Sequence, residues 1–279
     1  MLITAALALA GGYLALYVAL FFAQRSLLFQ PPAQVNTPSA QQGALLRIPG
    51  PAGAPVVIAT WLAPKEPGGG TAVMFHGNAE LLSDLESRTV VLHSIGLGVL
   101  CVEYPGYGLA PGAPSRDSLL AAGSAALAHL RGPLGVPARN TVLVAHSLGT
   151  GVAAELAARG EAGRQILLSP FTSIRELAAR VAPWAPVSLL LRDRFDTAAL
   201  APALKLPTLI VHGSNDEVIP SSMGRRLSEQ IAGARLIWVE GGMHNDLFVA
   251  HGREVGPEVL GFAFAAGRDG SAAATPGKN

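Results

Sequence analysis

One serine in the middle of the chain has surroundings suited to nucleophilic chemistry. Ser147 follows the apolar run 142–145, precedes a helical pattern, and has small residues, Ala145 and Gly149, two positions to either side. A sharp strand-to-helix turn exposes such a serine, and small neighbours let the helix pack against the adjoining strands. Glycine is usual where Ala145 stands, and one methyl group is the smallest departure. We predict that Ser147 is a nucleophile; the alternative is a helix-capping serine.

A serine hydroxyl needs a histidine to take its proton and a carboxylate to orient that histidine. Asp216 follows the apolar run 209–211, and His244 follows the apolar run 236–239. Loops at the carboxyl ends of parallel strands lie at one edge of a sheet. The chain order serine, acid, histidine is a known order for such groups. We predict a catalytic triad of Ser147, Asp216 and His244.

Other residues in these loops are alternatives to the triad members. Glu217 adjoins Asp216 and is the acid if the loop is shifted by one residue. We expect Asp246 to be solvated or to cap its loop. We expect His146 to line the mouth of the pocket, because consecutive residues in a tight turn point in different directions. His212 ends its strand too early to be the base.

Two backbone N–H groups are predicted to stabilise the oxyanion of an acyl-transfer reaction. Leu148, directly after the serine, supplies the first by its position. Asn78 supplies the second, because Gly77 permits a tight turn after the apolar run 72–75. Asn78 as an ordinary turn cap is an alternative that is compatible with this role.

Short apolar runs alternate with helical patterns along the chain, which favours a mainly parallel sheet with helices on both faces. The first strands have no helix between them and are expected to pair antiparallel at one edge. The candidate strands are 44–48, 56–62, 72–75, 99–102, 142–145, 166–168, 209–211 and 236–239. The candidate helices are 81–95, 115–130, 147–158, 221–231 and 254–266.

The N-terminal segment is long and apolar enough to cross a membrane. No charged residue occurs from Leu2 to Ala23, and a helix of that length covers the ~30 Å hydrocarbon core of a bilayer. A cleavable signal is the alternative, but the segment lacks a basic start and a clear cleavage site. We predict a transmembrane anchor over residues 1–24. Arg25 after it favours a cytoplasmic catalytic domain.

The rest of the chain divides by composition into a linker, one domain and a tail. Residues 25–43, rich in Pro, Gln and Ser towards their end, are predicted to be a spacer that lets the domain stand off the membrane. The catalytic domain is expected at 44–266. Residues 171–206 within it carry Trp184 and are interpreted as a small lid, or else as a helix completing the core. The tail 267–279 is expected to be mobile.

Composition excludes several classes of protein and site. Twenty basic and nineteen acidic residues leave a net charge of +1, which offers no broad field for nucleic acid. The single cysteine, Cys101, excludes a disulfide within the chain. No Cys/His cluster has zinc spacing, and no glycine-rich loop ends in Lys-Ser or Lys-Thr. We therefore expect no cofactor and no metal.

Several motifs together resemble one known family, the membrane-anchored, BEM46-like serine hydrolases of the α/β-hydrolase superfamily. They lie at 24–31, 76–78, 103–108, 145–149, 169–173 and 194–196, and in the loops of Asp216 and His244. The resemblance implies an α/β-hydrolase fold with an eight-stranded core and the same triad. Two departures are Ala145 for Gly, and Glu103 where relatives commonly carry Asp; the second is expected to affect a turn near the pocket.

The predicted activity is hydrolysis of a carboxylic ester or thioester through an acyl-enzyme. The membrane anchor and the apolar cover at 171–206 favour a small-molecule or lipid-like acyl ester as the substrate. A serine peptidase or amidase on the same triad is one alternative. A catalytically silent, membrane-anchored binding scaffold is another. A complete triad argues against the scaffold.

Overall fold

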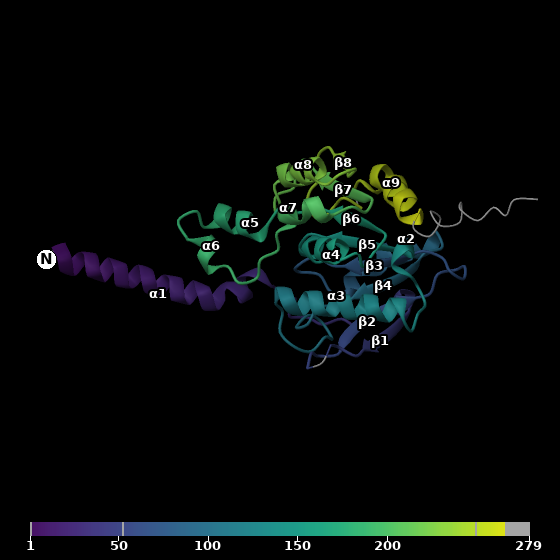
Figure 1. The fold of residues 1–279 in the computed structure, drawn as a ribbon, viewed down its shortest axis with the longest axis horizontal. Helices are drawn as coiled ribbons and strands as arrows, with labels where there is room; N and C mark the ends of the chain where they lie inside the picture. The colour runs from purple at the N-terminus through teal and green to yellow at the C-terminus, as the bar shows by residue number, and fades with distance from the viewer. Residues whose placement is uncertain (1, 52, 249, 266–279) are drawn as a thin grey trace, which may run out of the picture.

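The computed structural model describes residues 2–51, 53–248 and 250–265. The predicted tail at 267–279 lies outside these residues. One eight-stranded sheet organises the chain, with the order β1-β2-β4-β3-β5-β6-β7-β8 (Figure 1). The strands are β1 Ala44–Ile48, β2 Val57–Leu62, β3 Thr71–Phe75, β4 Gly98–Val102, β5 Thr141–His146, β6 Arg164–Leu168, β7 Thr208–Gly213 and β8 Arg235–Val239.

Strand directions confirm the mainly parallel sheet. The β1–β2 and β2–β4 pairs are antiparallel, and the five remaining neighbouring pairs are parallel. The inner strands β3, β4 and β5 are buried at every residue, as expected for strands covered on both faces. The carboxyl ends of the parallel strands therefore share one edge, where the predicted loops of the site begin.

Helices cover both faces of the sheet. After α1, Leu2–Leu28, the chain forms α2 Glu86–Ser94, α3 Arg116–Arg131, α4 Leu148–Ala158, α5 Ile174–Val181, α6 Val187–Leu190, α7 Thr197–Leu200, α8 Ser221–Gln230 and α9 Gly252–Phe264. Of these, α5 and α6 lie away from the sheet, beside α1 (Figure 1). Short 3₁₀ turns lie at Ala40–Gln42, Leu82–Leu85, Ala138–Asn140 and Ala201–Ala203. The predicted helix 81–95 is thus a 3₁₀ turn followed by α2.

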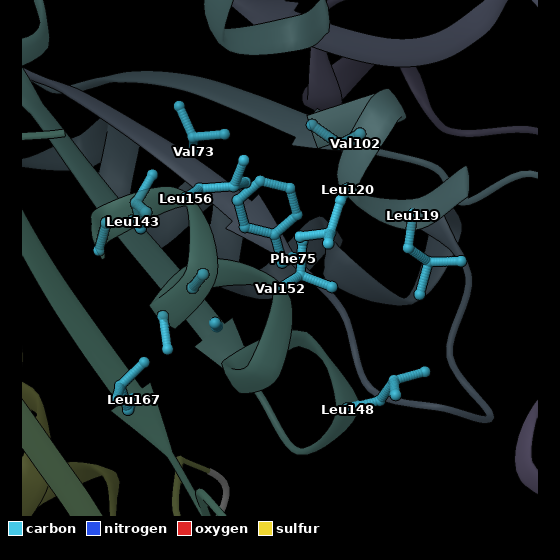
Figure 2. Packing of buried hydrophobic residues seen from close by; sticks show 14 of the residues in the cluster. Val73, Phe75, Val102, Leu119, Leu120, Leu143, Leu148, Val152, Leu156 and Leu167 are labelled. Carbon is cyan, nitrogen blue, oxygen red and sulfur yellow. The ribbon is translucent and has the colours of Figure 1, made fainter. Parts of the chain in front are cut away.

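Successive side chains of β3 point to opposite faces of the sheet, and they belong to two separate hydrophobic clusters. Val73 and Phe75 belong to the cluster that includes buried side chains of α3, α4 and α8. Ala72 and Met74 belong to the opposite cluster, with side chains of α2 and α9. Figure 2 shows Phe75 among side chains of α3 and α4, with Leu156 close to its ring.

The N-terminal helix α1, Leu2–Leu28, continues four residues past the predicted end of the anchor. It projects from the body, with α5 and α6 beside it (Figure 1). The residues after it return to the domain: Phe29 is buried, and buried Gln42 donates a hydrogen bond to the carbonyl of Leu82 over 2.5 Å. The segment predicted as a spacer is therefore attached to the domain at both ends.

We predict that Phe75→Ala lowers the free energy of unfolding by about 3–5 kcal/mol, because it leaves a cavity between β3 and α4. Urea unfolding followed by circular dichroism measures this change. Leu45→Ala, at a side chain that is 43% exposed on β1, is the control and is expected to cost ~1 kcal/mol or less. Equal losses in the two variants would contradict the assigned packing.

Candidate active site

Ser147 lies in a strained turn between β5 and α4. Its φ of 49° and ψ of −116° are unusual for a residue other than glycine, and such a conformation costs on the order of 1–3 kcal/mol. Its N–H donates to the carbonyl of Leu168 on β6 over 3.0 Å. A Cβ at Gly149 would lie 2.3 Å from the carbonyl oxygen of Phe75. Glycine there lets α4 begin directly against the end of β3.

The three predicted triad residues lie in one hydrogen-bonded line. His244 Nε2 is 3.0 Å from Ser147 Oγ. His244 Nδ1 is 2.9 Å from Oδ2 and 3.0 Å from Oδ1 of Asp216. Ser147 and His244 are 9% and 5% exposed, and the Asp216 side chain is fully buried. A proton can therefore pass between the hydroxyl and the imidazole without a bridging water.

The Asp216 carboxylate is held by its own loop as well as by His244. Oδ1 accepts hydrogen bonds from the backbone N–H groups of Val218, over 3.0 Å, and Ile219, over 2.7 Å. Oδ2 lies 3.2 Å from Nε2 of the buried His212. Burial opposes ionisation, but the hydrogen bonds to His212 and His244 outweigh it and hold the pKa of Asp216 well below its usual range.

The alternative acids have other contacts. Glu217 accepts a hydrogen bond from the backbone N–H of His244 over 3.2 Å. Asp246 accepts one from the backbone N–H of Met243 over 2.8 Å, which caps the loop. Of these three carboxylates, only Asp216 contacts the His244 ring.

His146 joins two loops of the site, a role that sequence reasoning missed. Its Nδ1 lies 3.0 Å from Glu80 Oε2, and its Nε2 lies 3.2 Å from the carbonyl oxygen of His244. Glu80 also pairs with Arg88 and accepts a hydrogen bond from the N–H of Gly77 over 2.6 Å. The loop after β3 is thus connected to the histidine loop. Nothing in the sequence spacing relates Glu80 to His146, which lie 66 residues apart.

The side chain of Asn78 is anchored on three sides. Its Oδ1 accepts hydrogen bonds from the Tyr107 hydroxyl, over 2.7 Å, and from the N–H of Gln30, over 3.0 Å. Its Nδ2 donates to the carbonyl of Leu28, the last residue of α1, over 2.8 Å. Leu148 is the first residue of α4, so its N–H has no partner within the helix.

Glu103, the second departure from the resembled family, faces the same loop. Its Oε1 lies 2.9 Å from Nε2 of His76, and both side chains are buried. Its Oε2 accepts a hydrogen bond from the N–H of Leu82 over 3.3 Å. Glu103 therefore connects the end of β4 to the loop that carries Asn78.

Among the described residues, no group of three or more His, Cys, Asp or Glu side chains is arranged to hold a metal ion.

Comparison with known proteins agrees with this architecture. Residues 67–204 match the family described as "Alpha/beta hydrolase family". The chain is 35% identical over 241 residues to an uncharacterized protein of Mycobacterium tuberculosis, covering 82% of this chain and 83% of that protein. The chain belongs to the alpha/beta hydrolase family.

Two further relatives extend the comparison. The human alpha/beta hydrolase domain-containing protein 17B is 35% identical over 179 residues, which cover 63% of this chain and 61% of that protein. The esterase Pf2001 of Pyrococcus furiosus superposes with a TM-score of 0.69 at 15% identity, over 84% of this hydrolase and 96% of the esterase. At that identity the likeness concerns the fold. The narrower BEM46-like resemblance stays a prediction.

The partly buried Glu80 predicts a pH dependence of this hydrolase's stability. Burial opposes its ionisation, but the hydrogen bond and charge of His146, with the charge of Arg88, hold the Glu80 pKa well below its usual range. The folded-state pKa is thus lower than the unfolded value of about 4.3. Ionised Glu80 therefore stabilises the fold above about pH 4.3, and this stabilisation is lost as the pH falls further.

We predict that Glu80→Gln is less stable than wild type at about pH 6, and that the difference shrinks towards about pH 3. Urea unfolding midpoints at each pH measure it. Glu258→Gln, which removes an exposed pair with Arg235, is the control and is expected to follow wild type closely. If the Glu80→Gln and wild-type midpoints fell in parallel, the assigned pKa shift would be wrong.

Proposed function

We propose that this protein is a serine hydrolase that cleaves carboxylic ester or thioester bonds through an acyl-enzyme, with a small-molecule or lipid-like acyl ester as substrate. The observation that carries the proposal is the unbroken hydrogen-bonded line from Ser147 through His244 to Asp216, with the serine in a strained strand-to-helix turn. Membership of the alpha/beta hydrolase family supports hydrolase chemistry.

The proposed first step is attack by the serine. His244 Nε2 takes the proton from Ser147 Oγ as Oγ bonds to the carbonyl carbon, and the carbonyl oxygen becomes an oxyanion. The N–H groups of Leu148 and Asn78 donate hydrogen bonds to that oxyanion. When the intermediate collapses, the bond to the alcohol or thiol breaks, and the leaving group receives the proton from His244.

Water completes the proposed cycle by the same route. His244 takes a proton from water as the water oxygen attacks the acyl carbon, and collapse releases the carboxylic acid and returns the proton to Ser147. Asp216 holds Nδ1 of His244 protonated, so that Nε2 faces the serine as an acceptor. Because the pKa of Asp216 is lowered, the carboxylate keeps its charge beside the imidazolium formed in each step.

We also propose that α1 anchors this hydrolase in a membrane, with the catalytic domain at residues 44–266 on the cytoplasmic side. In support, α1 is long and apolar enough to cross a bilayer by length and composition, with a mean hydropathy of 2.0 over its most apolar window. None of that window is buried against the rest of the described chain. A reporter fused after residue 279 tests the side.

We predict that a fluorophosphonate probe labels the wild-type protein, and that Ser147→Ala abolishes the labelling, because the probe reacts with an activated serine hydroxyl. In-gel fluorescence measures the labelled fraction. Ser222→Ala, at an exposed serine of α8, is the matched control and should label like wild type. A folded wild-type protein that takes no label would favour the catalytically silent scaffold. Labelling that persists in Ser147→Ala would place the nucleophile elsewhere.

We predict that Asp216→Asn lowers kcat for a p-nitrophenyl ester by about 10⁴-fold, because the imidazole loses its orienting charge. Glu217→Gln, a variant of the adjacent carboxylate that contacts only the backbone of His244, should lower kcat by about tenfold or less. Steady-state release of p-nitrophenolate measures both values. The opposite ranking would make Glu217 the orienting acid.

A further inference from the structure

The segment from Val181 to Leu191, which we call the α5–α6 tip, lies along α1 (Figure 1). The hydroxyls of Tyr13 and Tyr17 donate to the carbonyl of Trp184 over 3.1 and 3.5 Å. Nearer the body, the side-chain amide of Gln24 donates to the carbonyl of Leu190 over 3.1 Å. The tip therefore follows α1 from Gln24 towards its N-terminus.

This contact determines where a bilayer can meet the chain. Tyr13 precedes Gln24 by about 16 Å along the helix axis, at ~1.5 Å per residue. The part of α1 before Tyr13 is about as long again, which is roughly half of the ~30 Å hydrocarbon core. If α1 spans a bilayer, the stretch between Tyr13 and Gln24 must lie inside it. Trp184, which contacts that stretch, then lies inside it too.

The composition of the tip fits a lipid environment. No charged residue occurs between Val181 and Leu191. Three of its large side chains face away from the protein, with Val181 86%, Trp184 52% and Leu189 79% exposed. Water is an unfavourable surrounding for an apolar surface of this kind.

Charged residues begin where the tip joins the body. Arg192 follows the tip, and its guanidinium lies 5.4 Å from the centre of the Phe21 ring. The backbone N–H of Arg192 donates a hydrogen bond to the side-chain oxygen of Gln24 over 2.7 Å. One residue further on, Asp193 pairs with Arg25 of α1 over 2.8 Å. Arg25, Arg192 and Asp193 thus lie at one level, as expected of charged groups at the lipid headgroups.

We propose that the α5–α6 tip enters the same bilayer as α1, to the depth of Tyr13, with the headgroup level at Arg25 and Arg192. The proposal rests on the membrane position proposed for α1 and not on the proposed catalysis. The occupant of this surface is the lipid of the bilayer. An apolar groove of about 340 Å³ lies between α1 and α5–α6 at the base of the tip, lined by Leu27, Leu177 and Leu190 among others.

Tryptophan fluorescence tests the proposal in the full chain. The chain has three tryptophans, so Trp61→Phe with Trp238→Phe leaves Trp184 alone, and Trp61→Phe with Trp184→Phe leaves Trp238 of β8 as the matched control. Each variant is reconstituted into phosphatidylcholine vesicles containing phosphatidylcholine with a doxyl quencher on its acyl chain. Circular dichroism checks that each variant is folded.

We expect the doxyl lipid to quench Trp184 emission by about half or more, with a shift to shorter wavelength, because the indole lies among acyl chains. Trp238 emission should be unchanged. Equal quenching of the two would overturn the proposal.

A third reporter, Tyr13→Trp in a background with all three tryptophans replaced by Phe, follows α1 itself. Quenching at this reporter without quenching at Trp184 would overturn insertion of the tip while keeping the anchor. No quenching at either would overturn both. Ester hydrolysis does not enter the readout, so failure of the proposed catalysis is seen separately.

A second label keeps the proposal testable if the tryptophan variants do not fold. The native Cys101 is buried, so an environment-sensitive thiol dye attaches selectively at Leu189→Cys on the tip or at Ser222→Cys on α8. Dye emission at Leu189→Cys should increase several-fold on adding vesicles, and emission at Ser222→Cys should stay constant. Constant emission at both positions would contradict entry of the tip into lipid.

Discussion

The strained backbone of Ser147 is the constraint on which the site depends. A residue with a side chain adopts a φ of 49° at a cost on the order of 1–3 kcal/mol, so the turn persists only where its surroundings fix it. Here the neighbouring elements fix the turn from both sides. The serine N–H is bound to β6, and α4 begins so close to β3 that only glycine fits at position 149. The burial of β3, β5 and β6 maintains this geometry.

The parallel sheet explains why residues distant in the chain meet at this turn. Ser147 follows β5, Asp216 follows β7 and His244 follows β8, and these strands end at the same edge. The loops are then joined to one another by side chains. His146 connects Glu80 to the backbone of His244, and Glu217 holds the N–H of His244. The histidine ring is thus held through its backbone as well as through Asp216.

The part of this arrangement that depends on local pattern could be predicted from the sequence. Apolar runs placed the eight strands, and the loops after them located Ser147, Asp216 and His244. Contacts between loops could not be predicted from the sequence. The spacing of Glu80 and His146 along the chain does not indicate that the two residues are in contact, and the same holds for Asn78 and Leu28. The observed end of α1 differs from the predicted end of the anchor for another reason. Hydropathy falls at Gln24 and Arg25, but both residues tolerate a helix well, so the helix continues to Leu28.

The three hydrogen bonds to the side chain of Asn78 have a practical consequence for handling this protein. Two of the three partner atoms belong to Leu28 and Gln30, at the end of the apolar helix, and Phe29 between them is buried in the core. A shortened version cut near residue 30 to improve solubility would lose those supports and open a cavity beside the loop after β3. The apolar helix and the hydrolase domain are better treated as one folding unit and purified together.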